Sequence, residues 1–445
     1  MRSLVPQAGL WRHADFLKLW SAETISRFGS EITGLALPIV AVIVLDVSAF
    51  KVALLATIEF LPFIIFTLPA GVWVDRLPRR PILIAGDLGR AVLLATVPIA
   101  YAFDALTIWQ LYVVGFLFGI GTVFFDVAYQ SYLPALVDRE QLFEGNSKLE
   151  ISRSGSQIAG PGAAGALITL LTAPIAVLLD AISFVVSALF LFRIKKQEVL
   201  PAREGPRRGP FEGMGGELRE GLRFVLGHPH LRAITACTGI SNYFSQFMFS
   251  ILIVYAVREV GLSVGLIGLI LTLSNFGFLA GALSANKISA RLGVGRTIIS
   301  SAFLFGPALL LVPLAPRGAE VPFFIAAFAL VGFSAVIYNI TQVSYRQAIC
   351  PERLQGRMNS VVRFVVWGVI PLGSLSGGAV ATVFGLREAI WTGAIGGFFS
   401  FLPLVFSSLG SLQRLPEPEE EPLPSEASAA GGMAQSTPAA GAPDA

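Results

Sequence analysis

The sequence has few charged residues. Asp, Glu, Lys and Arg make up 14% of its 445 residues, whereas an ordinary globular chain carries about 25%. Apolar residues reach 54%, and a soluble fold that buried so many of them would need a charged surface for which the residues are missing. Because lipid removes that need, we expect this chain to lie in a membrane.

Cysteine and histidine are also scarce. The two cysteines, Cys237 and Cys350, form no CxxC pair, and the three histidines stand in polar flanks. This pattern implies neither a disulfide framework nor a metal site. The net charge of +3 is too small for the continuous basic face of a nucleic-acid-binding protein.

Sequence motifs for enzymes and ATP-driven pumps are missing. The chain contains no GxxxxGK[ST] loop, no GxGxxG opening a helix after a strand, no HExxH and no GxSxG. Each of these motifs places a phosphate, a metal or a nucleophile at a fixed position. We therefore expect no cofactor and no enzymatic activity, although charged residues in the first three apolar runs leave a membrane-embedded enzyme as a rival hypothesis.

What the chain does contain is a series of apolar runs. A membrane-spanning helix needs roughly 20 mostly apolar residues. Residues 1–15 lack the apolar core of a cleaved signal peptide, so we expect the first run to be retained as a span. One set of runs lies near 20–45, 51–73, 82–103, 107–128, 151–171 and 174–193. A second set lies near 233–257, 264–286, 297–315, 321–343, 362–384 and 390–411. We expect an all-α membrane protein of 12 transmembrane helices in two six-helix bundles, 1–193 and 231–412.

The segments outside the two sets differ in composition. The linker 194–230 is rich in Arg, Lys, Pro and Gly, and helical spacing within it predicts a short amphipathic helix at the cytoplasmic surface. The apolar residues of that helix are Leu218, Leu222, Val225 and Leu226. Residues 413–445 are rich in Pro, Glu and Ala, so we expect a disordered tail.

The basic residues are distributed unevenly between the two sides. If the N-terminus is inside, 26 of the 32 Lys and Arg residues fall on the cytoplasmic side, and the external loops hold four. Cytoplasmic loops carry such an excess, so we expect both termini in the cytoplasm. The external four are Lys51, Arg258, Arg317 and Arg387.

The two halves repeat a polar segment followed by a helix rich in Gly and Pro. The copies stand roughly 210 residues apart, and internal repeats of this kind are typical of secondary transporters. The first copy contains Asn146, Arg153 and GPGAAG at 160–165, and the second contains Asn359, Arg363, Pro371, Gly377 and Gly378.

The loop between the second and third runs reads GVWVDRLPRR over residues 71–80. It resembles the GxxxDRxGRR loop of the major facilitator superfamily, except that Pro78 replaces the second glycine. The resemblance implies two pseudo-symmetric six-helix bundles and a cytoplasmic gate completed by an acid at the end of the fourth helix. The gate residues would be Gly71, Asp75, Arg76, Arg79, Arg80 and Asp126. Alternatively, these charges serve only as topology signals.

The fifth run is punctuated by small residues and a proline. Small residues three or four apart let helices pack closely, and the proline opens the backbone hydrogen-bond ladder. The run resembles the gxxxGPxxGG signature of proton-coupled exporters in the same superfamily, which favours export, although it is also compatible with a generic packing interface. The residues concerned are Gly155, Gly160, Pro161 and Gly165.

A wider resemblance covers residues 15–410. Leu19-Trp20, Ser26–Gly29 and Asn146 resemble a bacterial drug-exporter branch that contains macrolide-efflux proteins and siderophore exporters. The branch implies a monomer in the cell membrane.

All acidic residues within the apolar runs, away from their ends, lie in the first half. An ionised residue at a helix centre costs roughly 2.5–3.5 kcal/mol on insertion scales, so it tends to face a cavity or a partner. Burial favours the neutral form of a carboxyl group, as a proton carrier requires. We hypothesise that Glu31 or Glu59 carries protons, with Arg27 tuning the exchange and Asp180 as a further candidate. Alternatively, these residues are fully paired structural locks.

The second half offers neutral polar groups instead. In the family that the chain resembles, helices seven and ten line the central cavity, which makes their polar residues candidate substrate contacts: Tyr243, Gln246, Tyr338, Asn339 and Gln342. We expect export of a small amphipathic molecule, drug-like or siderophore-like, by proton antiport with alternating access. Proton-coupled uptake of a small solute is the alternative, and the sequence does not identify the substrate.

Overall fold

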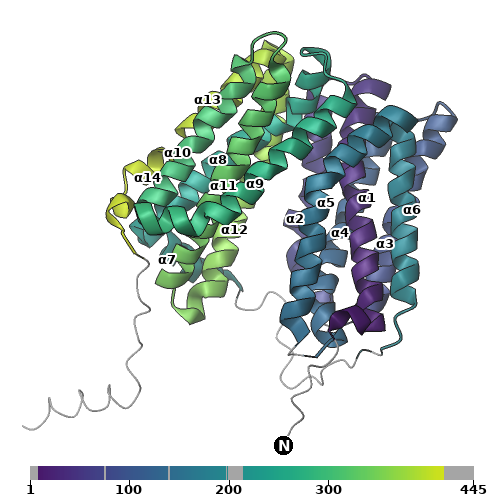
Figure 1. Cartoon of the computed structure of the whole chain (residues 1–445), viewed down its shortest axis with the longest axis horizontal. Helices are drawn as coiled ribbons and strands as arrows, with labels where there is room; N and C mark the ends of the chain where they lie inside the picture. The colour runs from purple at the N-terminus through teal and green to yellow at the C-terminus, as the bar shows by residue number, and fades with distance from the viewer. Residues whose placement is uncertain (1–8, 75–76, 139–140, 197, 199–213, 415–445) are drawn as a thin grey trace, which may run out of the picture.

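The computed structural model describes residues 9–74, 77–138, 141–196, 198 and 214–414. These residues form helices joined by short turns, and no strand occurs among them. Figure 1 shows two helical bundles side by side.

The N-terminal bundle contains the first six long helices. Among them α1 packs against α5 and α6, α3 packs against α4 and α6, and α2 packs against α4. A π-helical turn, Val40–Val44, extends α1. The helices are α1 (Ala14–Ile39), α2 (Ala49–Val74), α3 (Arg79–Ala102), α4 (Ile108–Leu136), α5 (Leu142–Leu171) and α6 (Ala173–Phe192).

The C-terminal bundle repeats this arrangement. In it α11 packs against α9 and α10, while α8 packs against α12 and α13. The last span begins as α13 and continues through a 3-10 turn, Phe399–Phe401, into α14. The helices are α8 (Pro229–Arg258), α9 (Val264–Leu292), α10 (Val294–Leu314), α11 (Glu320–Ile349), α12 (Glu352–Phe384), α13 (Leu386–Phe398) and α14 (Leu402–Val405).

Eleven helical segments of the described chain are long and apolar enough to cross a membrane. The twelfth expected span, 151–171, lies in α5, which is long enough but too rich in Gly, Ser and charged residues to qualify by hydropathy. α5 packs against α1 on one side and against α9 of the other bundle. A helix covered by protein on two sides needs little lipid-facing apolar surface, which explains its composition.

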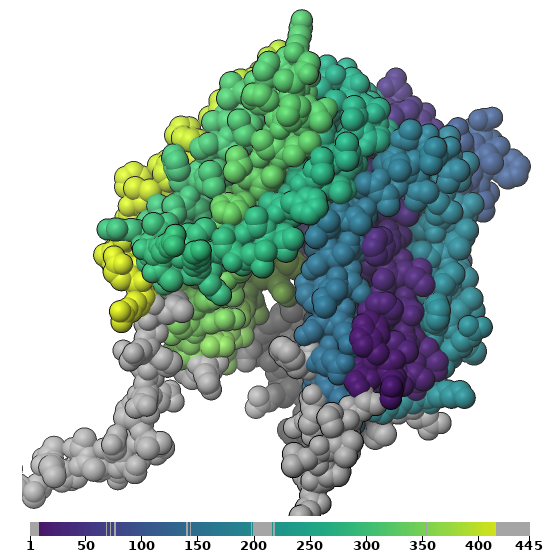
Figure 2. All heavy atoms as spheres, viewed as in Figure 1, coloured from purple at the N-terminus to yellow at the C-terminus, as the bar shows by residue number. Residues whose placement is uncertain are grey.

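The two bundles touch at one end and separate at the other. The contacts are made by α5 with α9 and by α2 with α12, and near the start of α2 the Ser374 hydroxyl donates to the Ala53 carbonyl at 2.7 Å. We call this the closed end. The opposite end contains the first turns of α1 and α3 and the end of α6, where the Lys195 amide donates to Asp15 and Arg80 donates to the Leu191 carbonyl. The coloured surfaces of the bundles diverge at this end in Figure 2, and we call it the basic end.

The linker contains the expected helix, α7 (Met214–Gly227), which packs against α12 and α8. The expected apolar face is divided, because Val225 is buried while Leu222 and Leu226 are exposed; the side chain of Leu218 lies outside the described residues. The expected disordered tail lies outside them from residue 415 onward. Gln413 is ordered, since its carbonyl accepts a hydrogen bond from the Val294 amide at 3.3 Å.

Candidate functional site

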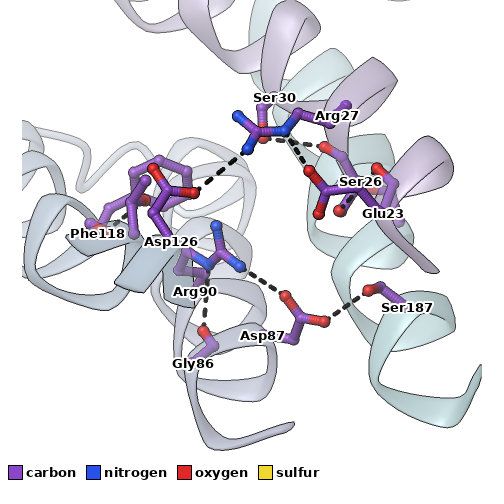
Figure 3. Close-up of polar contacts among 12 residues, drawn as sticks. Glu23, Ser26, Arg27, Ser30, Gly86, Asp87, Arg90, Phe118, Asp126 and Ser187 are labelled. Atoms are coloured by element: carbon purple, nitrogen blue, oxygen red, sulfur yellow. Dashed lines mark hydrogen bonds and ion pairs between the residues drawn. The ribbon is translucent and has the colours of Figure 1, made fainter. Parts of the chain in front are cut away.

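The first element of the site is a charge cluster between α1 and α4 (Figure 3). The Arg27 Nε donates to Glu23 Oε1 at 2.5 Å, and its Nη2 lies 3.3 Å from Asp126 Oδ1. Arg27 is four residues from both Glu23 and Glu31 on one helix, but its ion pairs are with Glu23 and Asp126. The guanidinium therefore links α1 to α4.

The position of Asp126 differs from the expected one. The family resemblance implied an acid at the cytoplasmic end of the fourth helix, and Asp126, near the end of the apolar run 107–128, was the candidate. The helix α4 instead continues to Leu136. Its last turns include Tyr132 and Leu133, which are buried in the hydrophobic core at the basic end. Asp126 thus lies inside the helix, where it pairs with Arg27.

A second charge pair is fully enclosed in the N-terminal bundle. Arg90 Nη2 lies 2.6 Å from Asp87 Oδ1, as the spacing of the two residues on α3 indicates, and the Ser187 hydroxyl of α6 donates to Asp87 Oδ2 at 2.6 Å. The Arg90 guanidinium lies 4.4 Å from the ring centroid of Phe125 and 4.2 Å from that of Phe184. This pair holds α3, α4 and α6 together.

Asp180, a candidate for proton coupling, has both carboxylate oxygens occupied. The Thr33 hydroxyl of α1 donates to Oδ2 at 2.5 Å, and the Ser183 hydroxyl donates to Oδ1 at 2.9 Å. Its side chain is fully buried against Gly29 of α1. This geometry favours a structural link between α1 and α6.

Glu31 and Glu59 differ from the other carboxylates. Both are half-buried, and neither forms a hydrogen bond or an ion pair with any residue that the structure describes. Each lies over a glycine of a neighbouring helix: a Cβ added to Gly160 of α5 would be 2.6 Å from Glu31 Cβ, and one added to Gly115 of α4 would be 2.9 Å from Glu59 Cγ. The glycines make room for carboxyl groups that have no hydrogen-bond or ion-pair partner in the described part of the chain.

The loop expected to form a gate is partly described. The Arg79 amide and Nη1 each donate to Glu198 of the linker at 2.7 Å, and Arg80 donates to the carbonyls of Leu191 and Phe192. The loop thus binds the start of α3 to the end of α6. A Cβ added to Gly71 of α2 would have no described atom within 4 Å apart from its chain neighbours and the nearby backbone of its own helix. Asp75 and Arg76 lie outside the described residues.

The small residues of α5 form its contact with the other bundle. A Cβ added to Gly162 would lie 2.7 Å from the Thr272 hydroxyl, and one added to Gly165 would lie 3.0 Å from Gly268 Cα, both in α9. Gly155 has open space around it. Gly160 faces Glu31, so the segment that contains Pro161 touches a candidate proton carrier and the opposite bundle at once.

The substrate candidates of the C-terminal bundle do not form one cluster. The Tyr338 hydroxyl is 2.8 Å from that of Thr238, which links α11 to α8. Gln342 is buried and donates to Asn339 at 2.9 Å, and Asn339 is exposed. Tyr243 packs edge-on against Phe244 with its backbone against Gly373, and Gln246 is half-buried.

Two contacts between the bundles were not anticipated. Arg258 Nη2, at the end of α8, lies 2.6 Å from Asp46 Oδ1 and donates to the Val42 carbonyl at 3.2 Å. Further toward the basic end, the rings of Phe60 and Trp367 meet edge-on at 6.1 Å. Each pair comes from opposite halves of the chain, and no local sequence signal connects its members.

Comparison with known proteins identifies the family to which this chain belongs. A model of the family described as transmembrane secretion effectors matches residues 6–430. The chain is 28% identical to the multidrug efflux pump Tap of Mycolicibacterium fortuitum over 351 residues, which are 76% of this chain and 83% of Tap. It is 22% identical to macrolide efflux protein A of Streptococcus pyogenes, over 84% of this chain and 91% of that protein.

The fold is also that of solved transporters. An inward-facing bacterial homologue of the iron transporter ferroportin superposes with a TM-score of 0.72 at 18% identity, over 91% of this chain and all of that one. The two-bundle architecture confirms the expected major facilitator fold. The chain belongs to the transmembrane secretion effector family of the major facilitator superfamily, and it is a membrane transporter, not an enzyme.

Proposed function

We propose that this transporter exports small amphipathic molecules from a bacterial cell in exchange for protons. The observation that carries the proposal is the contrast among the buried carboxyl groups: Glu23, Asp87 and Asp180 have polar partners, whereas Glu31 and Glu59 have none among the described residues. A carboxyl group that must change its charge during a cycle cannot be held permanently by a cation.

The arrangement of the bundles supports alternating access. Contacts at the closed end and divergence at the basic end correspond to a conformation open on one side. The excess of basic residues at the open end favours its placement in the cytoplasm. The substrate would enter there, and rocking of the bundles would open the closed end to the outside.

The coupling step would involve the contact between Glu31 and α5. In its charged form Glu31 favours a polar, hydrated setting, whereas its neutral form tolerates the packing against Gly160. Because α5 also carries Gly162 and Gly165 at the bundle interface, a change at Glu31 acts directly on the helix along which the bundles meet. Arg27, held by Glu23 and Asp126, adds a fixed positive charge one turn away.

The cargo would lie between the bundles. Tyr243, Gln246 and Asn339 would supply neutral polar contacts on the C-terminal side, while the Tyr338 hydroxyl links α11 to α8 and Gln342 donates to Asn339 within α11. Both relatives named above are efflux proteins, which supports export of drug-like compounds.

Transport by everted membrane vesicles tests the proposal. With an imposed proton gradient, vesicles that contain the protein should accumulate ethidium or erythromycin, and Glu31→Gln and Glu59→Gln should each abolish the gradient-dependent part. Glu150→Gln, an exposed acid in α5, is the matched control and should transport normally. Normal transport by both Glu31→Gln and Glu59→Gln would contradict proton coupling, and accumulation only in right-side-out vesicles would establish uptake by symport instead.

A further inference from the structure

One face of the linker helix α7 packs against the C-terminal bundle. Gly221 lies so close to α12 that an added Cβ would be 2.9 Å from the Arg357 carbonyl oxygen. Val225 is buried in the core that α7 shares with α12 and α8, and Glu220 forms an ion pair with Arg357. The position of α7 is therefore tied to the first turns of α12.

The opposite face of α7 is unusual for a surface in water. Leu222 is 41% exposed and Leu226 is 50% exposed, one turn apart. Arg219 and Arg223, also one turn apart, are exposed beside them. Together with Gly216 and Glu220, these four residues line an open hollow.

The location of α7 indicates what this face meets. The helix ends at Gly227, and only His228 separates it from α8, a helix long and apolar enough to cross the membrane. A helix with leucines and arginines on one face, placed at the membrane boundary, is suited to the headgroup region of the bilayer. Guanidinium groups bind phosphate oxygens through paired hydrogen bonds, and anionic headgroups complement their charge.

We propose that the outer face of α7 binds the headgroup of an anionic phospholipid. Leu222 and Leu226 would enter the boundary between headgroups and acyl chains, while Arg219 and Arg223 would bind the lipid phosphate. The occupied face would affect transport through α12, because α7 is fixed to its first turns and α12 meets α2 of the other bundle near Ser374. This lipid site is independent of the proposed direction of transport and of proton coupling.

Fluorescence quenching in vesicles tests the site without a transport substrate. The two native cysteines, Cys237 and Cys350, are buried and can be replaced by alanine, after which Leu226→Cys carries a single environment-sensitive fluorophore. The protein is reconstituted in phosphatidylcholine vesicles that contain the same fraction of either brominated phosphatidylglycerol or brominated phosphatidylcholine. We expect at least twofold stronger quenching by the brominated phosphatidylglycerol.

Paired variants assign the preference to the two arginines. Arg219→Gln with Arg223→Gln should make the two brominated lipids equally effective. The control, Arg291→Gln with Arg296→Gln, removes two exposed charges from the same end of the bundle and should keep the preference. If the Arg219/Arg223 variant fails to fold, native mass spectrometry of the unmodified protein, which should retain phosphatidylglycerol over phosphatidylcholine, provides the second measurement.

Three results would overturn the proposal. Absence of quenching by either lipid would place this face in water. Equal quenching of the labelled parent protein by both lipids would remove the anionic preference. Loss of the preference on addition of millimolar inorganic phosphate would identify a site for soluble phosphate instead of a lipid.

Discussion

The two bundles of this transporter have the same arrangement of helices but contain different kinds of buried polar group. In the N-terminal bundle, the buried or half-buried Glu23, Asp87, Asp126 and Asp180 have partners, whereas Glu31 and Glu59 have none among the described residues. In the C-terminal bundle, hydroxyls and amides on α8 and α11 bond to each other, and Arg346 of α11 is a buried basic residue. Among the residues that the structure describes, the buried carboxylates are thus concentrated in one half of a repeated fold.

This difference matters because charge and neutral polarity have different consequences in a membrane. A buried charge is costly unless it is paired, so the N-terminal bundle depends on its ion pairs for stability. Burying a neutral polar group costs less free energy than burying a charge, and such a group can hydrogen-bond to different partners in turn. We infer that the first bundle is suited to proton-dependent steps and the second to contacts with varied cargo, and four experiments examine that division.

The largest effect should come from Arg90→Ala. The substitution leaves the fully buried Asp87 without its cation, and breaking a buried pair in this way costs about 3–5 kcal/mol. Unfolding of the purified protein should therefore begin at much lower temperature or denaturant concentration. The matched change in the other bundle, Tyr338→Phe, removes a neutral hydrogen bond worth about 1 kcal/mol; equal losses in the two variants would contradict the comparison.

The contact between the bundles should be the next most sensitive position. In Gly165→Leu the new side chain would collide with Gly268 and the Val264 carbonyl. Overpacking costs about 1–3 kcal/mol, enough to lower ethidium transport by about tenfold. Gly155→Leu, at a position with open space, should transport at nearly the normal rate. Transport by Gly165→Leu at the normal rate would show that close contact between α5 and α9 at this position is not needed.

Polar groups of the C-terminal bundle should alter cargo affinity and leave coupling intact. Gln246→Ala and Asn339→Ala each remove one hydrogen-bonding group, which is worth about 0.5–1.5 kcal/mol, or roughly two- to tenfold in the KM for a given dye. The dependence of transport on the proton gradient, measured in parallel, should not change. Loss of that dependence in either variant would place coupling in both bundles.

The smallest effect should follow Arg258→Gln at the closed end. This variant removes the ion pair with Asp46, and exposed pairs contribute about 0.2–1 kcal/mol. The fraction of molecules in which the closed end has opened should rise by about 1.4- to fivefold. Longer distances between spin labels on Asp104→Cys and Arg317→Cys would detect this rise. Arg387→Gln removes a charge from the same end and should leave the distances unchanged; an identical shift there would attribute the effect to charge alone.

Much of the fold could be predicted from the sequence because hydropathy and the repeated motifs are local or periodic signals. The Asp87–Arg90 pair could also be predicted, since its members are three residues apart on one helix. Links such as Arg27 with Asp126, Thr33 with Asp180 and Arg79 with Glu198 could not, because one chain's periodicity does not specify how distant helices align. The place of Asp126 within α4 could not be predicted for a related reason. An apolar run marks the lipid-facing part of a helix, whereas α4 continues past the run to Leu136 through residues covered by protein.

The glycine contact between α5 and α9 also bears on how fast the bundles can exchange conformations. Where Gly165 meets Gly268, backbone faces backbone, so relative movement there requires no side chain to leave its rotamer and gain another. Interlocked side chains would have to separate and repack in each cycle, which adds an activation barrier even when the end states are equally stable. In the proposed transport cycle, a contact without side chains would keep that barrier low, so we expect these glycines to affect the turnover rate as well as the packing.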